Sequence, residues 1–152
     1  MTTEPTEGGC LCGTTRYQLT AEPLTLYACH CADCQNASGA SFLLALRLPA
    51  GGVVVTRGSA RPYVRGRPGG PQRNIFRCEK CLTAMWSERV EPASFVTIYA
   101  GTLDDTSHLQ PVAHMWTADA QPWIVLPNDR LLYVQSPPSM EPLIKAWRER
   151  NP

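Results

Sequence analysis

Seven cysteines set in tight groups constrain this chain of 152 residues more than any other feature. An odd number excludes a framework in which every cysteine is paired in a disulfide. In a chain without an export signal, clustered cysteines are more often metal ligands or catalytic thiols than disulfides. The three groups are Cys10 with Cys12, then Cys29 with Cys31 and Cys34, and finally Cys78 with Cys81.

The first and last groups together match the needs of a closed zinc site. Such a site takes four thiolates at tetrahedral corners, usually two from each of two tight turns. Cys10 and Cys12 form a C-x-C pair, and Cys78 and Cys81 form a C-x-x-C pair far along the chain. A C-x-x-C pair also occurs in redox proteins, but no βαβ pattern surrounds this one. We therefore predict a structural zinc ion held by these four cysteines.

The middle group offers three thiolates within six residues: Cys29, Cys31 and Cys34. Three protein ligands with one open position are typical of catalytic rather than structural zinc. His30 lies between two of these cysteines, but in an extended segment its side chain points away from theirs. We interpret it as a packing or hydrogen-bonding residue. Spacing alone also allows one four-cysteine site drawn from other pairs, with three thiols left free.

Many short strands are the expected secondary structure. Fourteen Pro and eleven Gly break the chain into short elements. Helical patterns are confined to residues 32–37, ended by Gly39, and to residues 141–150. A late hairpin is expected from strands at 123–126 and 131–134. The other predicted strands are 14–19, 24–29, 41–48, 53–56, 61–64, 73–77, 84–87 and 95–99. The predicted fold class is mainly β, built from short antiparallel strands with few short helices.

The length fits one domain. We expect a flexible N-terminus over residues 1–7, a zinc domain over 8–135 and a C-terminal extension over 136–152 whose helix packs on that domain. No apolar run approaches the roughly 18 residues of a membrane helix. The N-terminus lacks the basic and apolar regions of a signal peptide. We therefore expect a cytoplasmic protein that does not bind membranes.

Charge is balanced overall but uneven along the chain. The net charge of +1 argues against a general nucleic-acid binder. Residues 47–89, however, carry nine basic and two acidic side chains. Such a basic block suits a small anionic ligand better than a polyanion, although solvated arginine-rich strands explain it equally well. The candidate contacts to an anion are Arg47, Arg61, Arg65, Arg67 and Arg73.

Five segments resemble a known family. Residues 8–17 read GGCLCGTTRY, residues 29–42 read CHCADCQNASGASF, and residues 76–81 read FRCEKC. Near the C-terminus stand His114-Met115-Trp116 and Gln121-Pro122-Trp123. In this order and spacing they resemble the motifs of the glutathione-dependent formaldehyde-activating (Gfa-like) family, over roughly residues 8 to 126. Two positions depart from the family pattern: Leu82 replaces a glycine, and Gln35 stands where many members carry Arg.

The resemblance implies a zinc-bound, β-rich fold of the Mss4-like type. It implies that the four outer cysteines hold a structural zinc ion, and that Cys29, Cys31 and Cys34 hold a catalytic one. The implied activity is that of a carbon–sulfur lyase that joins glutathione to formaldehyde, giving S-hydroxymethylglutathione. The expected partners are then a small thiol, such as glutathione, and a small aldehyde. Two alternatives remain: a different thiol or aldehyde substrate, and a non-enzymatic zinc module that binds a protein.

Overall fold

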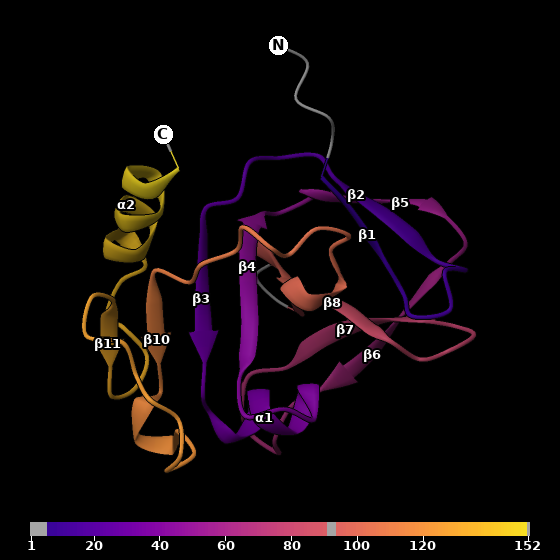
Figure 1. The fold of residues 1–152 in the computed structure, drawn as a ribbon. Helices are drawn as coiled ribbons and strands as arrows, with labels where there is room; N and C mark the ends of the chain where they lie inside the picture. The colour runs from indigo at the N-terminus through magenta and orange to yellow at the C-terminus, as the bar shows by residue number, and fades with distance from the viewer. Residues whose placement is uncertain (1–5, 91–93, 152) are drawn as a thin grey trace. The chain divides into compact units, whose positions relative to one another are not determined.

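The computed structural model describes residues 6–90 and 94–151 of the chain. It divides into two compact units, Met1–Pro23 with Arg47–Ser107 and Leu24–Leu46 with His108–Pro152, called here unit 1 and unit 2. Strands run through both units (Figure 1), and the described residues contain only two α-helices. The predicted mainly-β fold is therefore confirmed. No helix within the described ranges is long and apolar enough to cross a membrane.

Unit 1 is built from antiparallel strands. A three-stranded sheet has the order β1 (Glu7–Gly9), β2 (Arg16–Leu19) and β5 (Val53–Arg57). A meander follows, made of β6 (Ala60–Arg65), β7 (Arg73–Cys78), β8 (Ala84–Arg89) and β9 (Phe95–Tyr99). A 3₁₀ turn, η1 (Ala100–Thr102), continues from β9. Short strands joined by turns rich in Gly and Pro explain this simple up-and-down order.

Aromatic side chains fill the core of unit 1. The ring of Tyr17 is fully buried and meets Trp86 edge-on at 5.6 Å between centroids, while Phe76 stacks on Trp86 at 5.0 Å. The Tyr17 hydroxyl is hydrogen-bonded to Thr102 Oγ1 at 2.7 Å. Gly8 lies against this tyrosine so closely that a Cβ atom would stand 2.5 Å from the ring carbon Cζ. The core therefore requires glycine in β1.

Unit 2 has parallel pairing at its centre. Strand β10 (Ala113–Met115) runs parallel to both β3 (Thr25–Cys29) and β11 (Leu131–Tyr133). Helix α1 (Ala32–Ser38) follows β3 (Figure 1). The chain then passes from unit 2 to unit 1 within β4 (Leu43–Pro49). A second 3₁₀ turn, η2 (Thr117–Asp119), follows β10. Parallel neighbours need long connections, and residues 30–112, 83 in number, connect the end of β3 to the start of β10.

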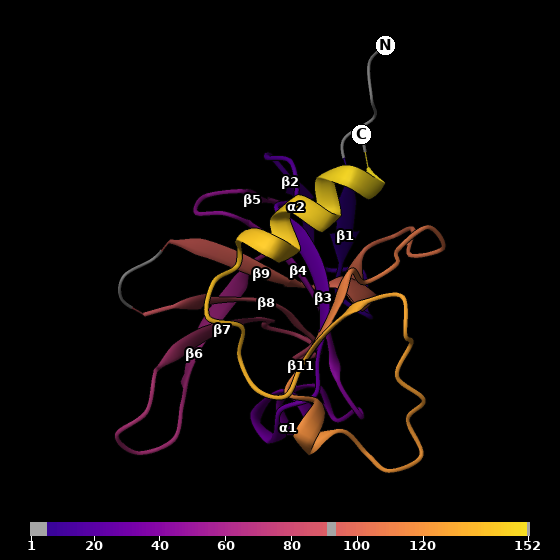
Figure 2. The ribbon, with the colours of Figure 1, turned by 90° about the vertical axis from the view of Figure 1, so that its left-hand side faces the viewer.

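Helix α2 (Glu141–Arg150) packs on β3 of the same unit (Figure 2). Its Leu143 side chain is fully buried, and Thr25 Oγ1 of β3 donates to the Leu143 carbonyl at 3.1 Å. A proline in the first turn and arginines in the last turn fit the preferences of helix ends. The helix predicted at residues 141–150 is confirmed.

Each of the eight strands predicted before residue 100 coincides with an observed strand, with small shifts at the ends. The helix predicted at 32–37 is α1, and Gly39 ends it with a φ of 66°. The predicted late hairpin is wrong. Residues 123–126 form no strand, since Trp123 and Val125 are exposed and have no core to pack against. The strand expected at 131–134 exists as β11, but it pairs with β10 in parallel.

Two strands were not predicted. Strand β1 contains two glycines, which are weak strand formers, and β10 is too short to show an alternating pattern. Residues 1–5 of the predicted flexible N-terminus lie outside the described residues, whereas Glu7 already belongs to β1.

Candidate metal centres

The structure brings the first and last cysteine groups together in unit 1. The Sγ atoms of Cys10, Cys12, Cys78 and Cys81 all lie within 4.8 Å of one another. The Sγ–Sγ distance is 3.5 Å from Cys10 to Cys12 and 3.9 Å from Cys12 to Cys78. Two turns 66 residues apart in sequence therefore converge on one point, as a four-thiolate metal site requires.

Each turn of this four-cysteine cluster directs backbone N–H groups at sulfur. The amide of Thr15 donates to Cys10 Sγ at 3.2 Å, and the amide of Lys80 donates to Cys78 Sγ at 3.4 Å. Leu82 adopts a φ of 62°, the left-handed conformation in which glycine is favoured. Its amide donates to the Cys78 carbonyl at 3.0 Å. The turn thus forms with leucine in the place of the family's glycine.

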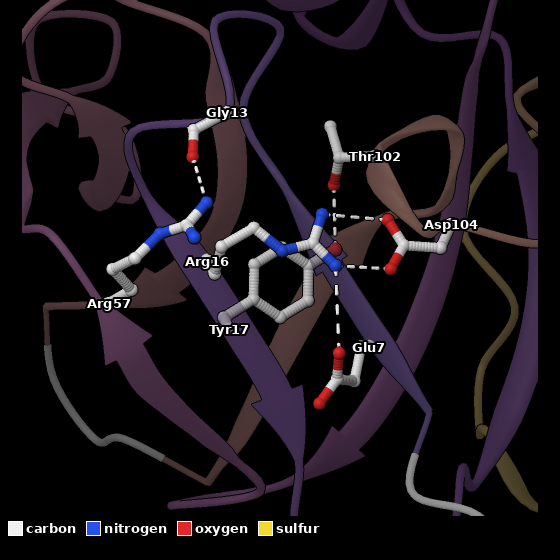
Figure 3. Close-up of polar contacts among 7 residues, drawn as sticks. All are labelled: Glu7, Gly13, Arg16, Tyr17, Arg57, Thr102 and Asp104. Atoms are coloured by element: carbon white, nitrogen blue, oxygen red, sulfur yellow. Dashed lines mark hydrogen bonds and ion pairs between the residues drawn. The ribbon is translucent and has the colours of Figure 1, made fainter.

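Hydrogen bonds and ion pairs hold the segment that follows Cys12, from Gly13 to Arg16 (Figure 3). Arg57 of β5 donates to the Gly13 carbonyl at 2.5 Å. Arg16 of β2 donates to Asp104 Oδ1 at 2.8 Å and lies 3.7 Å from the Glu7 carboxylate. These arginines therefore have structural partners next to the four-cysteine cluster.

Local hydrogen bonds favour the charged form of two of these thiols. The Thr83 hydroxyl, hydrogen-bonded to Cys81 Sγ at 3.1 Å, lowers the pKa of Cys81 to about 5. Hydrogen bonding to Thr15 lowers the pKa of Cys78. Burial instead raises the pKa of Cys10. Four soft sulfur donors, two of them inclined to thiolate, fit a zinc ion.

Cys29, Cys31 and Cys34 form a separate cluster in unit 2. Their Sγ atoms lie within 4.8 Å of one another, and those of Cys29 and Cys31 are 3.6 Å apart. The cluster forms where β3 ends and α1 begins. Cys31 is the N-cap of α1, and its Sγ accepts a hydrogen bond from the Cys34 amide at 3.4 Å. A strand end joined directly to a helix turn therefore gathers three thiols from six residues.

The three thiols differ in their affinity for protons. Hydrogen bonds from Cys29 and Cys34 lower the pKa of Cys31 to about 2. The same bond to Cys31 raises the pKa of Cys29 to about 11, and hydrogen bonding with Cys29 raises the pKa of Cys34. Hydrogen bonding among the three thiols therefore favours the thiolate form at Cys31. Three soft donors fit a zinc ion that keeps one coordination position for a ligand from outside the chain.

His30 packs and hydrogen-bonds beside this cluster. Its ring is fully buried, stacks on His114 and packs near Phe42, with centroids 5.2 Å apart in each case. A hydrogen bond of 2.9 Å joins His30 Nε2 to His114 Nδ1. Burial lowers the pKa of both imidazoles. Within the described residues, the group of mutually close ligand atoms comprises only the three cysteines.

Gln35 has a role that the sequence did not reveal. Its side-chain amide donates to the His30 carbonyl at 2.6 Å and to the Asp119 carbonyl at 2.9 Å, and it accepts from Gln121 Nε2 at 2.7 Å. The only sequence signals were the departure from arginine at position 35 and the Gln121-Pro122-Trp123 motif. Ser38, which follows in α1, donates to the Cys34 carbonyl at 2.8 Å and serves the helix backbone.

Arg61 and Arg47, both proposed as anion contacts, have partners within unit 1. Arg61 pairs with Glu79 at 2.6 Å. Arg47 is buried, with its guanidinium carbon 3.8 Å from the centre of the Phe95 ring. Arg65 lies in β6, Arg73 in β7 and Arg67 in the loop between them. Recognition of an anion by this group stays a prediction.

Comparisons with known proteins agree with the motif pattern. The family profile described as "Glutathione-dependent formaldehyde-activating enzyme" matches residues 5–119. No curated protein sequence matches the chain. Among solved structures, a crystal structure of a Rhodobacter sphaeroides protein is similar with a TM-score of 0.50 and 17% sequence identity, covering 84% of this chain and 98% of that one. At that identity the likeness concerns the fold alone.

Proposed function

Because the chain belongs to the glutathione-dependent formaldehyde-activating enzyme family, we propose that it is a zinc-dependent carbon–sulfur lyase-type enzyme. It condenses a small thiol, such as glutathione, with formaldehyde or a related small aldehyde. The observation that carries the proposal is the division of seven cysteines into a cluster of four and a cluster of three. A fold by itself does not determine function, but a site with three thiols and no fourth ligand among the described residues has a specific chemical use.

The four-cysteine cluster is assigned a structural role. A tetrahedral ion in this cluster would take all four of its ligands from Cys10, Cys12, Cys78 and Cys81, which would leave no position for a substrate. Metal binding in such a site contributes directly to folding. This cluster would hold the turns after β1 and β7 together in unit 1.

The three-cysteine cluster is assigned as the site where the thiol and the aldehyde react. A zinc ion held by three thiolates supplies an open position that keeps an external thiol in its nucleophilic thiolate form near neutral pH. Cys29, Cys31 and Cys34 would be the ligands, with Cys31 already favouring the thiolate. In the net reaction the thiol sulfur forms a bond to the carbonyl carbon of the aldehyde. The π electrons of that carbonyl move to its oxygen, which takes up the proton released by the thiol.

A cobalt-substituted protein gives the test. Glutathione should change the sulfur-to-cobalt charge-transfer band, because a fourth sulfur reaches the metal, whereas S-methylglutathione has no thiol to offer and should leave the band unchanged. In the zinc protein, S-hydroxymethylglutathione should form faster than in a protein-free mixture, and Cys31→Ser should remove that excess rate.

The opposite outcome would favour the non-enzymatic alternative. If the cobalt band ignores glutathione, or if S-methylglutathione changes it equally, the three-cysteine cluster is a second structural site. The chain would then be better described as a zinc-binding module for protein interactions, for which the exposed Leu11 and Leu82 of the four-cysteine turns offer apolar contacts.

A further inference from the structure

The peptide groups around His30 are held on both sides. The His30 amide donates to the Met115 carbonyl at 2.9 Å, and the His30 carbonyl accepts from Gln35 Nε2 at 2.6 Å. These are the peptide groups that connect Cys29 to His30 and His30 to Cys31. Their hydrogen bonds fix the direction in which two of the three thiols of the cluster project.

The nitrogen and the oxygen of the Gln35 side-chain amide both form hydrogen bonds. Both N–H groups are engaged, one with the His30 carbonyl and one with the Asp119 carbonyl, and the amide oxygen accepts from Gln121 at 2.7 Å. The donor at residue 121 leaves the Gln35 amide one favourable orientation, with oxygen toward Gln121 and nitrogen toward the two carbonyls. Both glutamines are half-buried, so these bonds are partly shielded from water.

The hydrogen-bonding partners of His30 and Gln35 that lie beyond α1 come from one segment. His114 and Met115 belong to β10, Asp119 ends η2, and Gln121 follows it. The hydrogen bonds of this segment to His30 and Gln35 span 84 to 86 residues of sequence. The segment has no cysteine, and it therefore acts on the cluster only through hydrogen bonds and packing.

We propose that Gln35 and Gln121, called here the glutamine clamp, are positioning residues that hold the loop from Cys29 to Cys34 in the shape needed to bind metal and thiol. The inference rests on the proposed function for its purpose, but it makes a separate claim about metal affinity. Outer hydrogen-bond partners of a metal site commonly affect its affinity by about 10- to 100-fold.

The chemistry of the clamp explains why the residue at position 35 is glutamine. An arginine there donates hydrogen bonds but has no acceptor for Gln121. A glutamate accepts from Gln121 but cannot donate to the carbonyls of His30 and Asp119. Only an amide provides two donors and one acceptor at this place.

Cobalt titration of each cluster tests the clamp. Gln35→Leu should weaken cobalt binding at the three-cysteine cluster by about 10- to 100-fold, and Gln35→Glu should do the same although it preserves size. Gln121→Glu should also weaken it, because its carboxylate meets the Gln35 oxygen or forces the amide to turn away from both carbonyls. Gln121→Lys, which still donates, should keep most of the affinity.

The same chain supplies the controls. The affinity of the four-cysteine cluster should not change in any variant, which verifies that unit 1 is folded. Gln135→Leu replaces an exposed glutamine of unit 2 and should leave both clusters unchanged. In protein that carries metal at the four-cysteine cluster only, hydrogen exchange of the amides from His30 to Cys34 should be faster in Gln35→Leu than in the parent, so the clamp is tested without metal at the three-cysteine cluster.

The clamp is overturned if Gln35→Leu and Gln121→Glu leave the affinity, the charge-transfer band and the exchange rates of the loop as they are in the parent. Failure of the proposed function gives a different pattern. In that case the parent would not accelerate condensation of glutathione with formaldehyde, while the metal affinity of the three-cysteine cluster would still fall in the clamp variants.

Discussion

Leu82 is one of two described residues other than glycine that have a positive φ, the second being Trp116. A left-handed φ costs roughly 1–2 kcal/mol for a residue with a Cβ atom, and the Leu82 side chain is 55% exposed, so it gains little from packing. Leu82→Gly should therefore stabilise the folded protein by about 0.5–1 kcal/mol after the greater chain entropy of glycine is subtracted. Denaturant unfolding of the zinc-loaded protein measures this.

Leu11 provides a matched control for that change. It is also an exposed leucine in a turn of the four-cysteine cluster, but it does not have a positive φ. Leu11→Gly should lower stability by about 0.5 kcal/mol, because it relieves no backbone strain and only adds the greater chain entropy of glycine in the unfolded state. If both changes had the same sign, the strain at Leu82 would not be the cause.

The ion pair between Asp104 and Arg16 makes a pH-dependent contribution to the free energy of unfolding. The hydrogen bond from Arg16 holds the pKa of the Asp104 carboxyl below its ordinary value of 3.8. A depressed pKa in the folded state means that the ion pair stabilises the protein above about pH 4 and that this contribution is lost as the pH falls through the folded value. Since Asp104 is half exposed, Asp104→Asn should cost only about 0.5–1 kcal/mol at pH 7.

The unfolding free energies of the parent and Asp104→Asn should converge as the pH is lowered below 4. Measurements at several pH values, in the same denaturant and salt, would show this. A difference that stays constant down to pH 3 would mean that the carboxylate charge is not responsible. Added salt at pH 7 should also reduce the difference, because the pair is partly open to solvent.

At the scale of elements, the pairing of β1 with β2 depends on the absence of a side chain at Gly8. A Cβ atom there would lie 2.5 Å from Tyr17 Cζ and 2.6 Å from the Thr102 carbonyl oxygen. Neither neighbour can retreat easily, because Tyr17 is buried and hydrogen-bonded to Thr102. Gly8→Ala should therefore destabilise the protein by about 1–3 kcal/mol, as overpacking of a core does.

Gly101→Ala tests whether the effect at Gly8 is one of space. Gly101 lies in η1, has no positive φ and has nothing within 4 Å of an added Cβ atom. Its replacement should change stability by less than about 0.5 kcal/mol. Thermal unfolding of both variants compares them directly, and equal losses would argue against the clash at Tyr17.

The elements were predictable where a pattern and its boundaries lie in one short stretch of sequence. Phe95–Tyr99 is an apolar, β-branched and aromatic run, and it forms β9 at the predicted residues. The pairing partner of a strand cannot be predicted from such a local pattern. Pro127-Asn128-Asp129 resembles a hairpin turn, yet the strand that follows it pairs in parallel with β10, whose three residues are too few to show a period.

For the whole molecule, the two cysteine clusters predict two zinc ions per chain, which elemental analysis can count. Removing the four-cysteine site should abolish stable folding, since structural zinc contributes about 10 kcal/mol or more in small zinc domains. Cys78→Ser should therefore unfold unit 1. Cys31→Ser should remain folded and retain one zinc ion. Equal loss of structure in both variants, by circular dichroism, would contradict this division of roles.

The cysteine clusters were predictable because ligand spacing within a turn is local, and the resemblance supplied the partition that spacing left open. The clamp was not predictable. Gln35 and Gln121 contact each other across 86 residues, and neither residue type signals a metal site. His30 could be judged a packing residue from strand alternation, but its partner His114 could not be identified, because pairing of β10 with β3 depends on the complete fold.

The parallel pairing of β3 with β10 also has a consequence for biosynthesis. The thiols of Cys29, Cys31 and Cys34 leave the ribosome well before His114 and Asp119, whose contacts with the loop lie 84 residues further along the chain. At about 5–20 residues per second, synthesis of that stretch takes roughly 4 to 17 s. During that interval three closely spaced thiols lack the segment that later holds them. Nascent chains therefore pass through a period of heightened sensitivity to oxidants and to competing soft metals, which ends when the C-terminal third emerges.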